Sequence, residues 1–454
     1  MKLIGLDIGT TSICGVMLDA ETGHVLDKMT KPNDSTIFTE EHFARCQDAT
    51  AILDVVEEIL HDLVKRDTDI AAIGISTQMH GILYVNALGA PVSPLYTWQD
   101  GRGDLPYGDG RTYCDVFTEL TGYPIATGYG LVTHFYNVVN HMAPSNAASL
   151  CTIGDYVAMK LAQQTRPVTD VTNAASLGAF ELQKGRFDVL RLAAVGIQAD
   201  ILPEVVPCGH RVGETVQHIP VFSALGDNQA SFLGAVPSAD DTLLINVGTG
   251  AQVSLLSDDF IQAPHFETRP FPGNQFLLVG ATLSGGKAYA RLEQFFREVV
   301  TLFGDDAPAS LYSKMSDVLD RTPTAVESLE VTPWFYGTRE NPQARGSIQN
   351  ISTDNFTPAH LMVGVLEGIV HDLAAYHQHL PQALRQRIRQ LVGSGNGIRK
   401  NAHLAAMIER QFGKGMRLSA NEEEASVGAA LCAGVGSGVF SSFAAASAML
   451  SFQS

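Results

Sequence analysis

The sequence predicts an α/β fold made of two similar domains that face one another across a cleft. Two observations lead to this prediction. The chain has 454 residues, of which 45% are hydrophobic and 17% charged, which is typical of a globular protein with two or three domains. A strand-turn-strand segment at residues 3–18 is repeated at residues 242–257. A repeat at this distance is too long for a solenoid and indicates two related domains.

The first copy reads LIGLDIGTTSICGVML, an apolar strand followed by a Gly-Thr-Thr turn and a second strand. The second copy, TLLINVGTGAQVSLLS, has the same order of strand, turn and strand. The alignment pairs Asp7 with Asn246, Gly9 with Gly248, Thr10 with Thr249 and Thr11 with Gly250. We therefore expect one structural unit to occur once in each domain.

Both turns have the composition of a phosphate-binding loop. Glycine lets the backbone approach a ligand closely, and consecutive N–H groups and threonine hydroxyls donate to anionic oxygens. Two such turns facing each other would hold a polyphosphate from both sides. The alternative is a pair of ordinary tight hairpins, which one copy alone would favour and the matched pair makes less plausible.

The two copies differ at one informative position, because Asp7 carries a charge and Asn246 does not. A metal-bound phosphate chain needs a hard carboxylate oxygen nearby to hold or orient hydrated Mg²⁺. We assign that role to Asp7, and we expect Asn246 to supply hydrogen bonds only.

The loop YTWQDGRG at residues 96–103 combines an aromatic side chain with polar groups of both signs, namely Trp98, Asp100 and Arg102. Such a set suits a polyhydroxylated ligand, because hydroxyls donate to the carboxylate and accept from the guanidinium. The alternative is a surface ion pair of Asp100 and Arg102 beside a buried Trp98.

Asp227 lies in ALGDNQASF, between a strand end and the first turn of an expected helix. This position predicts an N-cap, whose N–H donors would also keep the carboxylate ionised. Residues 233–241, with a proline, a serine and two acidic residues, read as a linker between this helix and the second turn. We place a domain boundary and a hinge for domain closure near Ser238.

A third glycine-rich loop, GSGNG at residues 393–397, follows an expected strand at 388–392 and precedes a helix at about 401–412. It could pass flat against a base or ribose, although a plain strand-to-helix turn is equally compatible. LSGGKA at residues 283–288 is a weaker signal of the same kind. The glutamates of NEEEASVGAALCAG, residues 421–434, are expected in the first turn of a structural helix.

Charge and composition exclude several classes of function. The net charge of −18 would repel nucleic acid. The N-terminus lacks the apolar run of a secretory signal, and the longest weakly apolar stretch, residues 438–450, is well short of the ~20 residues of a membrane span. We expect a cytoplasmic protein with no membrane partner. The six cysteines form no C-x-x-C pair, so neither zinc nor a disulfide framework is indicated.

With GLDIGTTS, GDNQAS, NVGTGAQ and GSGNG in this order, the sequence resembles the FGGY carbohydrate kinases of the actin-like ATPase superfamily, over about residues 3–438. The resemblance implies two ribonuclease H-like domains, 1–238 and 239–454, which bind ATP, Mg²⁺ and a sugar. The first domain would bind the sugar and carry the catalytic aspartate, and the second would bind adenosine.

The resemblance also implies roles for individual residues. Asp227 corresponds to the catalytic base, while the metal role of Asp7 rests on its charge. The ATP contacts would be Gly9, Thr10, Thr11, Ser12, Gly248, Thr249 and Gly250 at the phosphates, and Gly393, Gly395 and Asn396 at the adenosine. ISTQMHGILYV, residues 75–85, resembles the sugar-binding turn of xylulokinases and sedoheptulokinases. The substrate contacts would be Gln78, Met79, His80, Trp98, Asp100, Arg102 and Asp227.

Within the family, TWQDGR, TGYGLVTHFY, DVTNAASLGAFE and GSGNG look more like sedoheptulokinases than xylulokinases. We expect ATP-dependent phosphorylation of a terminal primary hydroxyl of a ketose, with sedoheptulose first and xylulose or another sugar as the alternative. NVGTGAQ departs from the serine-rich turn of some sedoheptulokinases. A catalytically inactive sugar or nucleotide sensor is the non-enzyme alternative, and a homodimer is compatible with the sequence.

Overall fold

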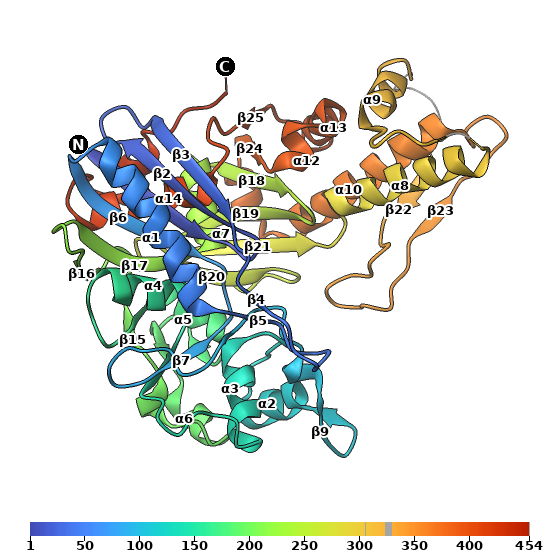
Figure 1. The fold of residues 1–454 in the computed structure, drawn as a ribbon. Coiled ribbons are helices and arrows are strands. Elements are labelled where there is room, and N and C mark those ends of the chain that lie inside the picture. Colours follow the sequence, from blue (N-terminus) through green and yellow to red (C-terminus); the bar gives the residue numbers. More distant parts are fainter. Residues whose placement is uncertain (305, 323–328, 454) are drawn as a thin grey trace. The chain divides into compact units, whose positions relative to one another are not determined.

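The computed structural model describes residues 1–304, 306–322 and 329–453, which divide into two compact units (Figure 1). The first unit comprises Met1–Pro237, Arg269–Phe276 and Glu423–Ser451, and the second comprises Ser238–Thr268, Leu277–Glu422 and Phe452–Ser454. The first break in the chain falls between Pro237 and Ser238, at the expected linker. The sequence suggested one boundary only, whereas two later segments also pack into the first unit.

The first unit is built on a six-stranded sheet in the order β16-β17-β6-β1-β2-β3. The strands are β1 (Lys2–Ile8), β2 (Ser12–Asp19), β3 (Val25–Pro32), β6 (Ile70–Thr77), β16 (Arg211–Glu214) and β17 (Pro220–Gly226). β1 and β2 form the antiparallel hairpin that the sequence predicted, and β6 runs parallel to β1.

The two faces of this sheet are covered by different helices. Ile4 and Leu6 belong to an apolar core that includes residues of α1 (Ala49–Arg66) and α4 (Ile153–Leu161), and Figure 1 shows α1 lying over the strands. Gly5 lies on the other face, because side chains alternate along a strand. A Cβ there would lie 1.8 Å from the backbone oxygen of Ser426 in α14 (Glu424–Gly436).

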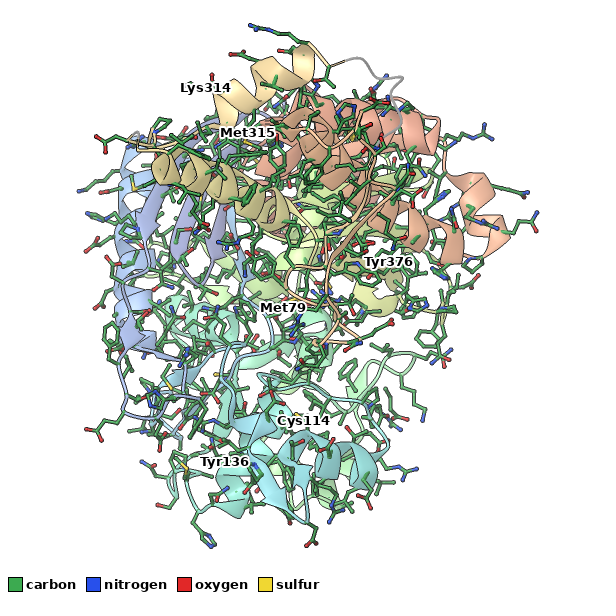
Figure 2. All side chains as sticks on the ribbon, turned by 90° about the vertical axis from the view of Figure 1, so that its right-hand side faces the viewer. Met79, Cys114, Tyr136, Lys314, Met315 and Tyr376 are labelled. Carbon is green, nitrogen blue, oxygen red and sulfur yellow. The ribbon has the colours of Figure 1, made fainter. Side chains whose placement is uncertain are left out.

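A second apolar cluster in this unit gathers aromatic and aliphatic side chains from α2 (Tyr113–Thr121) and α3 (Gly130–Val139), and aliphatic ones from α5 (Val171–Leu177). Tyr113 contacts Tyr136 edge to face, with ring centroids 4.8 Å apart. Figure 2 labels Tyr136 and Cys114 in this part of the molecule. The cluster supports the loops that bear the predicted sugar-binding residues.

The second unit is built on a six-stranded sheet in the order β20-β21-β19-β18-β24-β25, in which β20 and β21 also include residues of the 269–276 segment. The strands are β18 (Thr242–Val247), β19 (Ala251–Ser257), β20 (Glu267–Phe271), β21 (Gln275–Thr282), β24 (Gln390–Ser394) and β25 (Met416–Leu418). The long helices of this unit include α8 (Gly286–Leu302) and α10 (Pro358–His379), and residues of both join the strands in one apolar core.

The two sheets share one topology over four strands. In each, an antiparallel hairpin is extended on its first strand by two parallel strands, β6 and β17 in the first unit and β24 and β25 in the second. The predicted α/β fold with two related domains is therefore confirmed. None of the helices in the described ranges is long and apolar enough to cross a membrane.

Two details of the predicted helices were wrong. α14 begins at Glu424 with Glu423 as its N-cap, so one glutamate rather than three lies in its first turn. Residues 396–399 of the third glycine-rich loop form a short helix, α12 (Asn396–Arg399), before α13 (Ala402–Phe412) begins. Composition specifies neither the non-helical path of the glutamates before α14 nor the helical turn within the glycine-rich segment before α13.

Candidate functional site

The first phosphate turn, Gly9 to Ser12, closes the β1/β2 hairpin with a hydrogen bond from the Gly9 N–H to the Ser12 carbonyl, 3.0 Å long. Asn33 follows β3 and holds the turn from the side, because its Nδ2 donates to the Gly9 carbonyl at 2.8 Å. The Asn33 N–H donates to the Thr11 carbonyl at 2.9 Å. The side chains of Thr11 and Ser12 are exposed. A phosphate can therefore reach their hydroxyls without displacing these bonds.

Thr10 is placed differently from its two neighbours. Its hydroxyl donates to Oε1 of Gln78, 3.1 Å away, and accepts from Nε1 of Trp98, 3.0 Å away. A hydroxyl has one proton, so this proton is already used within the protein. The structure thus joins the predicted phosphate turn directly to two of the predicted sugar-binding residues.

Asp7 is at the end of β1, beside Ser76 of the parallel strand β6, whose hydroxyl donates to Oδ1 at 2.8 Å. Burial, and then the nearby charge of Asp227, raise the pKa of Asp7 to about 7, although the Ser76 bond acts in the opposite direction. Two neighbouring carboxylates are stabilised by a cation. The described residues contain no group of three His, Cys, Asp or Glu side chains suited to a metal. Asp7 would therefore share a cation with phosphate oxygens and water.

Asp227 is the first residue of α7 (Asp227–Ala235), and Gly226 occupies the N-cap position. The predicted capping role is therefore wrong by one residue. Burial raises the pKa of the Asp227 carboxylate. Arg269 partly offsets this rise by its positive charge, and so does the backbone N–H of Asn228.

Met79 lies in the turn after β6 and is only 5% exposed (Figure 2). A Cβ on Gly226 would lie 2.8 Å from its sulfur, so Met79 packs against the residue that precedes Asp227. Nη1 of Arg269 is 3.9 Å from the same sulfur. No sequence motif indicated Arg269. It lies in a segment more than 40 residues after Asp227, and tertiary packing alone brings it close to Asp227.

His80 is held in a defined orientation. It has a left-handed backbone (φ 74°), its Nδ1 is 2.7 Å from the Ser176 carbonyl, and its ring lies 4.3 Å from that of Tyr129. A carbonyl accepts only, so Nδ1 carries the proton and Nε2 is the acceptor nitrogen. A neutral histidine of this tautomer can accept a hydrogen bond from a sugar hydroxyl.

Asp100 and Arg102 form a buried ion pair, 0% and 1% exposed, with Nε of Arg102 donating to Oδ1 of Asp100 at 2.6 Å. Arg102 also donates to Oδ1 of Asn137 at 2.6 Å and lies over the ring of Tyr96. Trp98, in contrast, is 46% exposed. The alternative of a surface pair beside a buried tryptophan is therefore wrong. The ion pair fixes the loop, and Trp98 presents a face to solvent.

In the second unit, Asn246 occupies the place that Asp7 has in the first. Its Nδ2 donates to the hydroxyl of Ser394 at 2.7 Å, and β18 runs parallel to β24 in the same register as β1 and β6. The pairing of Asp7 with Asn246 from the sequence is thus matched by equivalent contacts to a serine.

A cavity of about 800 Å³ lies beside this turn. Of the predicted nucleotide residues, it brings together Gly248, Thr249, Gly395 and Asn396. Gly395 has a left-handed backbone (φ 81°), and a Cβ there would lie 2.6 Å from the Val247 carbonyl, so only glycine fits. Gly250 instead packs on the backbone of Gly285, and Gly393 is buried.

The cavity also has walls that the sequence analysis did not identify. Apart from Asn246 and Gly397, which stand in the two predicted loops, the lining residues are Gly286, Lys287, Tyr289, Ala290, Tyr312, Ser316, Leu319, Leu366, Ile369, Lys400, Asn401, His403 and Leu404. The weak LSGGKA signal was the one pointer to this wall, since Gly286 and Lys287 open α8. Aromatic and aliphatic side chains at one end and glycine turns at the other suit a planar base and its phosphates.

Comparison with family models gives a match over nearly the whole chain. The model described as FGGY family of carbohydrate kinases, N-terminal domain, matches residues 2–234, and the corresponding C-terminal domain matches residues 243–437.

Comparison with individual proteins agrees with this match. Sedoheptulokinase from Mus musculus is 29% identical, with 90% of this chain and 92% of the relative covered. The structure of a ligand-bound xylulose kinase from Lactobacillus acidophilus has a TM-score of 0.84 at 21% identity, covering 100% and 93% of the two chains. Plasmodium falciparum glycerol kinase, solved with ADP, has a TM-score of 0.79 at 19% identity, covering 97% and 90%. At these identities the two structures establish the fold alone.

Proposed function

The chain belongs to the FGGY family of carbohydrate kinases, and from this premise we propose that it transfers the γ-phosphoryl group of ATP to a terminal primary hydroxyl of a ketose. The observation that carries the proposal is the packing of Met79, from the polar Gln-Met-His-Gly turn, against the backbone that bears Asp227. A hydroxyl-binding turn and a carboxylate able to accept a proton thus lie together in one unit.

Sedoheptulose is the ketose that we favour. Tyr129 and Ser176, which orient His80, come from the two segments whose sequences resemble sedoheptulokinases, and a sedoheptulokinase is among the most similar relatives. Xylulose is the second candidate, because the Gln-Met-His-Gly turn is also typical of xylulokinases. Both sugars offer a terminal primary hydroxyl, so the chemistry is the same.

In the reaction, Asp227 accepts the proton of the attacking hydroxyl. The hydroxyl oxygen forms a bond to the γ-phosphorus while the bond to the β,γ-bridging oxygen breaks, and ADP leaves with that electron pair. Phosphoryl transfer requires little covalent work from the protein, so positioning and charge neutralisation carry most of the catalysis. Nε2 of His80 and the thioether of Met79 would orient the sugar.

The residues present fit Mg²⁺. Asp7 offers a hard carboxylate oxygen, and its Oδ1 also accepts a hydrogen bond from the Ser76 hydroxyl. Its pKa is raised first by burial and then by the nearby charge of Asp227. When bound, Mg²⁺ neutralises charge on the phosphates. Asp7 would orient it through water, the exposed Thr11 and Ser12 would donate to phosphate oxygens, and the cavity of the second unit would hold the adenosine.

The proposed function is tested by measuring ADP release with sedoheptulose, xylulose, ribulose and glycerol. We expect turnover that requires a ketose and is fastest with sedoheptulose. A higher kcat/KM for xylulose would reassign the substrate. ATP hydrolysis that no sugar accelerates would contradict the kinase assignment for these substrates, and binding of sugar and nucleotide without any turnover would indicate a sensor.

Asp227→Asn tests the assignment of the base. The amide cannot accept the proton, and a positioned general base contributes about 10²- to 10⁴-fold, so we expect kcat to fall by at least about 100-fold. Binding of a non-hydrolysable ATP analogue should be unchanged. The exposed Asp200→Asn is the matched control and should retain wild-type turnover. A variant within about tenfold of wild type would assign proton transfer to another group.

A further inference from the structure

A closed ring of hydrogen bonds connects the phosphate turn with the sugar turn in the first unit. The Thr10 hydroxyl donates to Oε1 of Gln78 at 3.1 Å, and Nε2 of Gln78 donates to Oε1 of Gln47 at 3.0 Å. Nε2 of Gln47 then donates to the Thr10 carbonyl at 2.9 Å. The ring therefore begins and ends on one residue of the phosphate turn and passes through one residue of the sugar turn.

Gln47 is well placed to hold this ring. It is 3% exposed and lies on β5 (Cys46–Gln47), paired with Leu95 of β8 (Leu95–Tyr96) and directly before the N-cap Asp48 of α1. A primary amide whose oxygen and nitrogen are both hydrogen-bonded has one orientation. If the amide of Gln47 were flipped, its nitrogen would face the nitrogen of Gln78, and its oxygen would face the Thr10 carbonyl oxygen. Gln47 thereby fixes which end of the Gln78 amide meets Thr10.

Trp98 connects this ring to the surface. Its Nε1 donates to the Thr10 hydroxyl at 3.0 Å, and 46% of the side chain is exposed. A sugar that stacks on the indole of Trp98, or that forms a hydrogen bond with Gln78, would therefore restrain Thr10. Both the carbonyl and the hydroxyl of Thr10 are hydrogen-bonded to residues of this network. Buried hydrogen-bond networks of this kind respond as a unit when one member is restrained.

We propose that Gln47 is a positioning residue that couples the two substrates: through Thr10 and Gln78 it makes ketose binding tighten the binding of nucleotide phosphates, and the reverse. The proposal rests on the proposed kinase function. Such coupling is reciprocal and typically amounts to about 5- to 150-fold in affinity. This coupling would order the phosphate turn only when the ketose is bound, and it would thereby limit transfer of the phosphoryl group to water.

The experiment measures the Kd of a non-hydrolysable ATP analogue with Mg²⁺, by calorimetry, with and without saturating sedoheptulose. For wild type we expect sedoheptulose to lower this Kd by at least about fivefold. In Gln47→Met, which keeps the side-chain length but loses both hydrogen bonds, we expect the ratio of the two Kd values to fall to within twofold of one. The Kd without sugar should change much less.

Two further variants separate coupling from stability. Trp98→Phe keeps an aromatic face but loses Nε1, and it should also reduce the ratio while leaving the fold intact. Gln390→Met is the matched control, because Gln390 donates to Asp241 and Thr242 in the second unit and touches neither turn of the first. It should keep the wild-type ratio. Thermal unfolding identifies any variant that fails to fold.

The outcomes distinguish the two proposals. A wild-type enzyme that turns over ketose but shows no coupling, or folded Gln47→Met and Trp98→Phe variants that retain the wild-type ratio, would overturn the coupling role and leave the kinase function standing. A wild-type protein that neither binds nor phosphorylates any of the ketoses would overturn the proposed function itself.

Discussion

At the scale of single residues, Gly226 is constrained by what surrounds it rather than by its own conformation. Its backbone is extended (φ −64°, ψ 140°), which any residue can adopt. A Cβ, however, would lie 2.8 Å from the sulfur and 2.9 Å from the methyl carbon of Met79, and 2.9 Å from Oε1 of the buried Gln229. The small residue before Asp227 therefore lets the turn that bears Met79 approach the proposed base.

Gly226→Ala should disturb the acceptor site while sparing the nucleotide site. The added methyl group displaces Met79 and alters the approach of the sugar to Asp227. Because misplacement by about 1 Å can cost about 100-fold, we expect kcat/KM for the ketose to fall by roughly 10- to 100-fold. The Kd of an ATP analogue in the absence of sugar, measured by calorimetry, should stay within about twofold of wild type. An unchanged kcat/KM would show that Met79 is not fixed by this contact.

Several site residues could be predicted from the sequence because their signal is local. Asp7 and Asn246 were paired through the repeat, and Gly395 through the need for glycine in a tight loop. The orientation of side chains could not be predicted in the same way. The bond of the Thr10 hydroxyl to Gln78 and the burial of Asp100 and Arg102 depend on segments 35 to 68 residues away. Gln47, Asn33 and Arg269 stand in no motif at all.

At the scale of elements, the repeat relates the sugar turn to the adenosine loop. Gln78 comes two residues after Ser76, which bonds to Asp7, and Asn396 comes two residues after Ser394, which bonds to Asn246. Both residues therefore occupy the same place at the end of the parallel strand next to a phosphate hairpin. The proposed roles thus place a sugar contact in one unit and a nucleoside contact in the other at the same structural position.

Close packing of α14 on its neighbours depends on glycines at the contacts. A Cβ on Gly74 of β6 would lie 1.9 Å from the Ala429 carbonyl oxygen, and one on Gly428 would lie 1.9 Å from the Ala230 carbonyl oxygen. These neighbours are backbone atoms, which cannot rotate away. The sequence indicated small residues in this helix, but the matching glycines on β1 and β6 became evident only with the sheet and helix in place.

Gly74→Ala should therefore destabilise the first unit. Inserting a methyl group into a packed interface typically costs about 1–3 kcal/mol, and backbone atoms on the other side favour the upper end of this range. The measurement is the free energy of unfolding in urea. Gly415→Ala is the control, because the nearest atom to its Cβ would be 3.9 Å away. Equal effects of the two substitutions would mean that α14 can shift to accommodate the extra atoms.

At the scale of the whole molecule, the order of the chain and its compact units do not coincide. The segments 269–276 and 423–451 follow the second phosphate hairpin in sequence but pack with the first unit. The segment 423–451 packs there because α14 covers the open face of the first sheet. The segment 269–276 is tied to the same unit by a hydrogen bond from Nε2 of Gln229, in α7, to the Pro270 carbonyl. A linear boundary near Ser238 could be predicted from proline and acidic residues, whereas the return of these segments depends on contacts between distant apolar faces.

Buried carboxylates should make the stability of the first unit depend on pH. Asp155, in α4, is 1% exposed. Burial, despite the hydrogen bonds from Thr152, raises its pKa to about 7 from an ordinary value of 3.8. Between about pH 4 and pH 7, the Asp155 carboxyl is therefore protonated in the folded state and ionised in the unfolded state. This contribution stabilises the fold below pH 4 and is lost as the pH rises through 7.

Asp155→Asn should remove that contribution, because the amide stays neutral at every pH and its oxygen can still accept from the Thr152 N–H. Other groups, such as His134, whose pKa is lowered to about 4 by burial, act alike in both proteins and cancel in the difference. Since each unit of pKa is worth about 1.4 kcal/mol, the variant should gain at least about 1 kcal/mol on wild type between pH 5 and pH 8.

The protein has two tryptophans, Trp98 in the first unit and Trp334 in the second. A Trp334→Phe background therefore makes Trp98 fluorescence a reporter of the first unit alone, and urea unfolding followed by this signal at pH 5, 6, 7 and 8 gives the required free energies. If the wild-type and Asp155→Asn profiles run parallel from pH 5 to pH 8, Asp155 ionises in the fold as easily as in the unfolded chain, and water must reach its carboxylate.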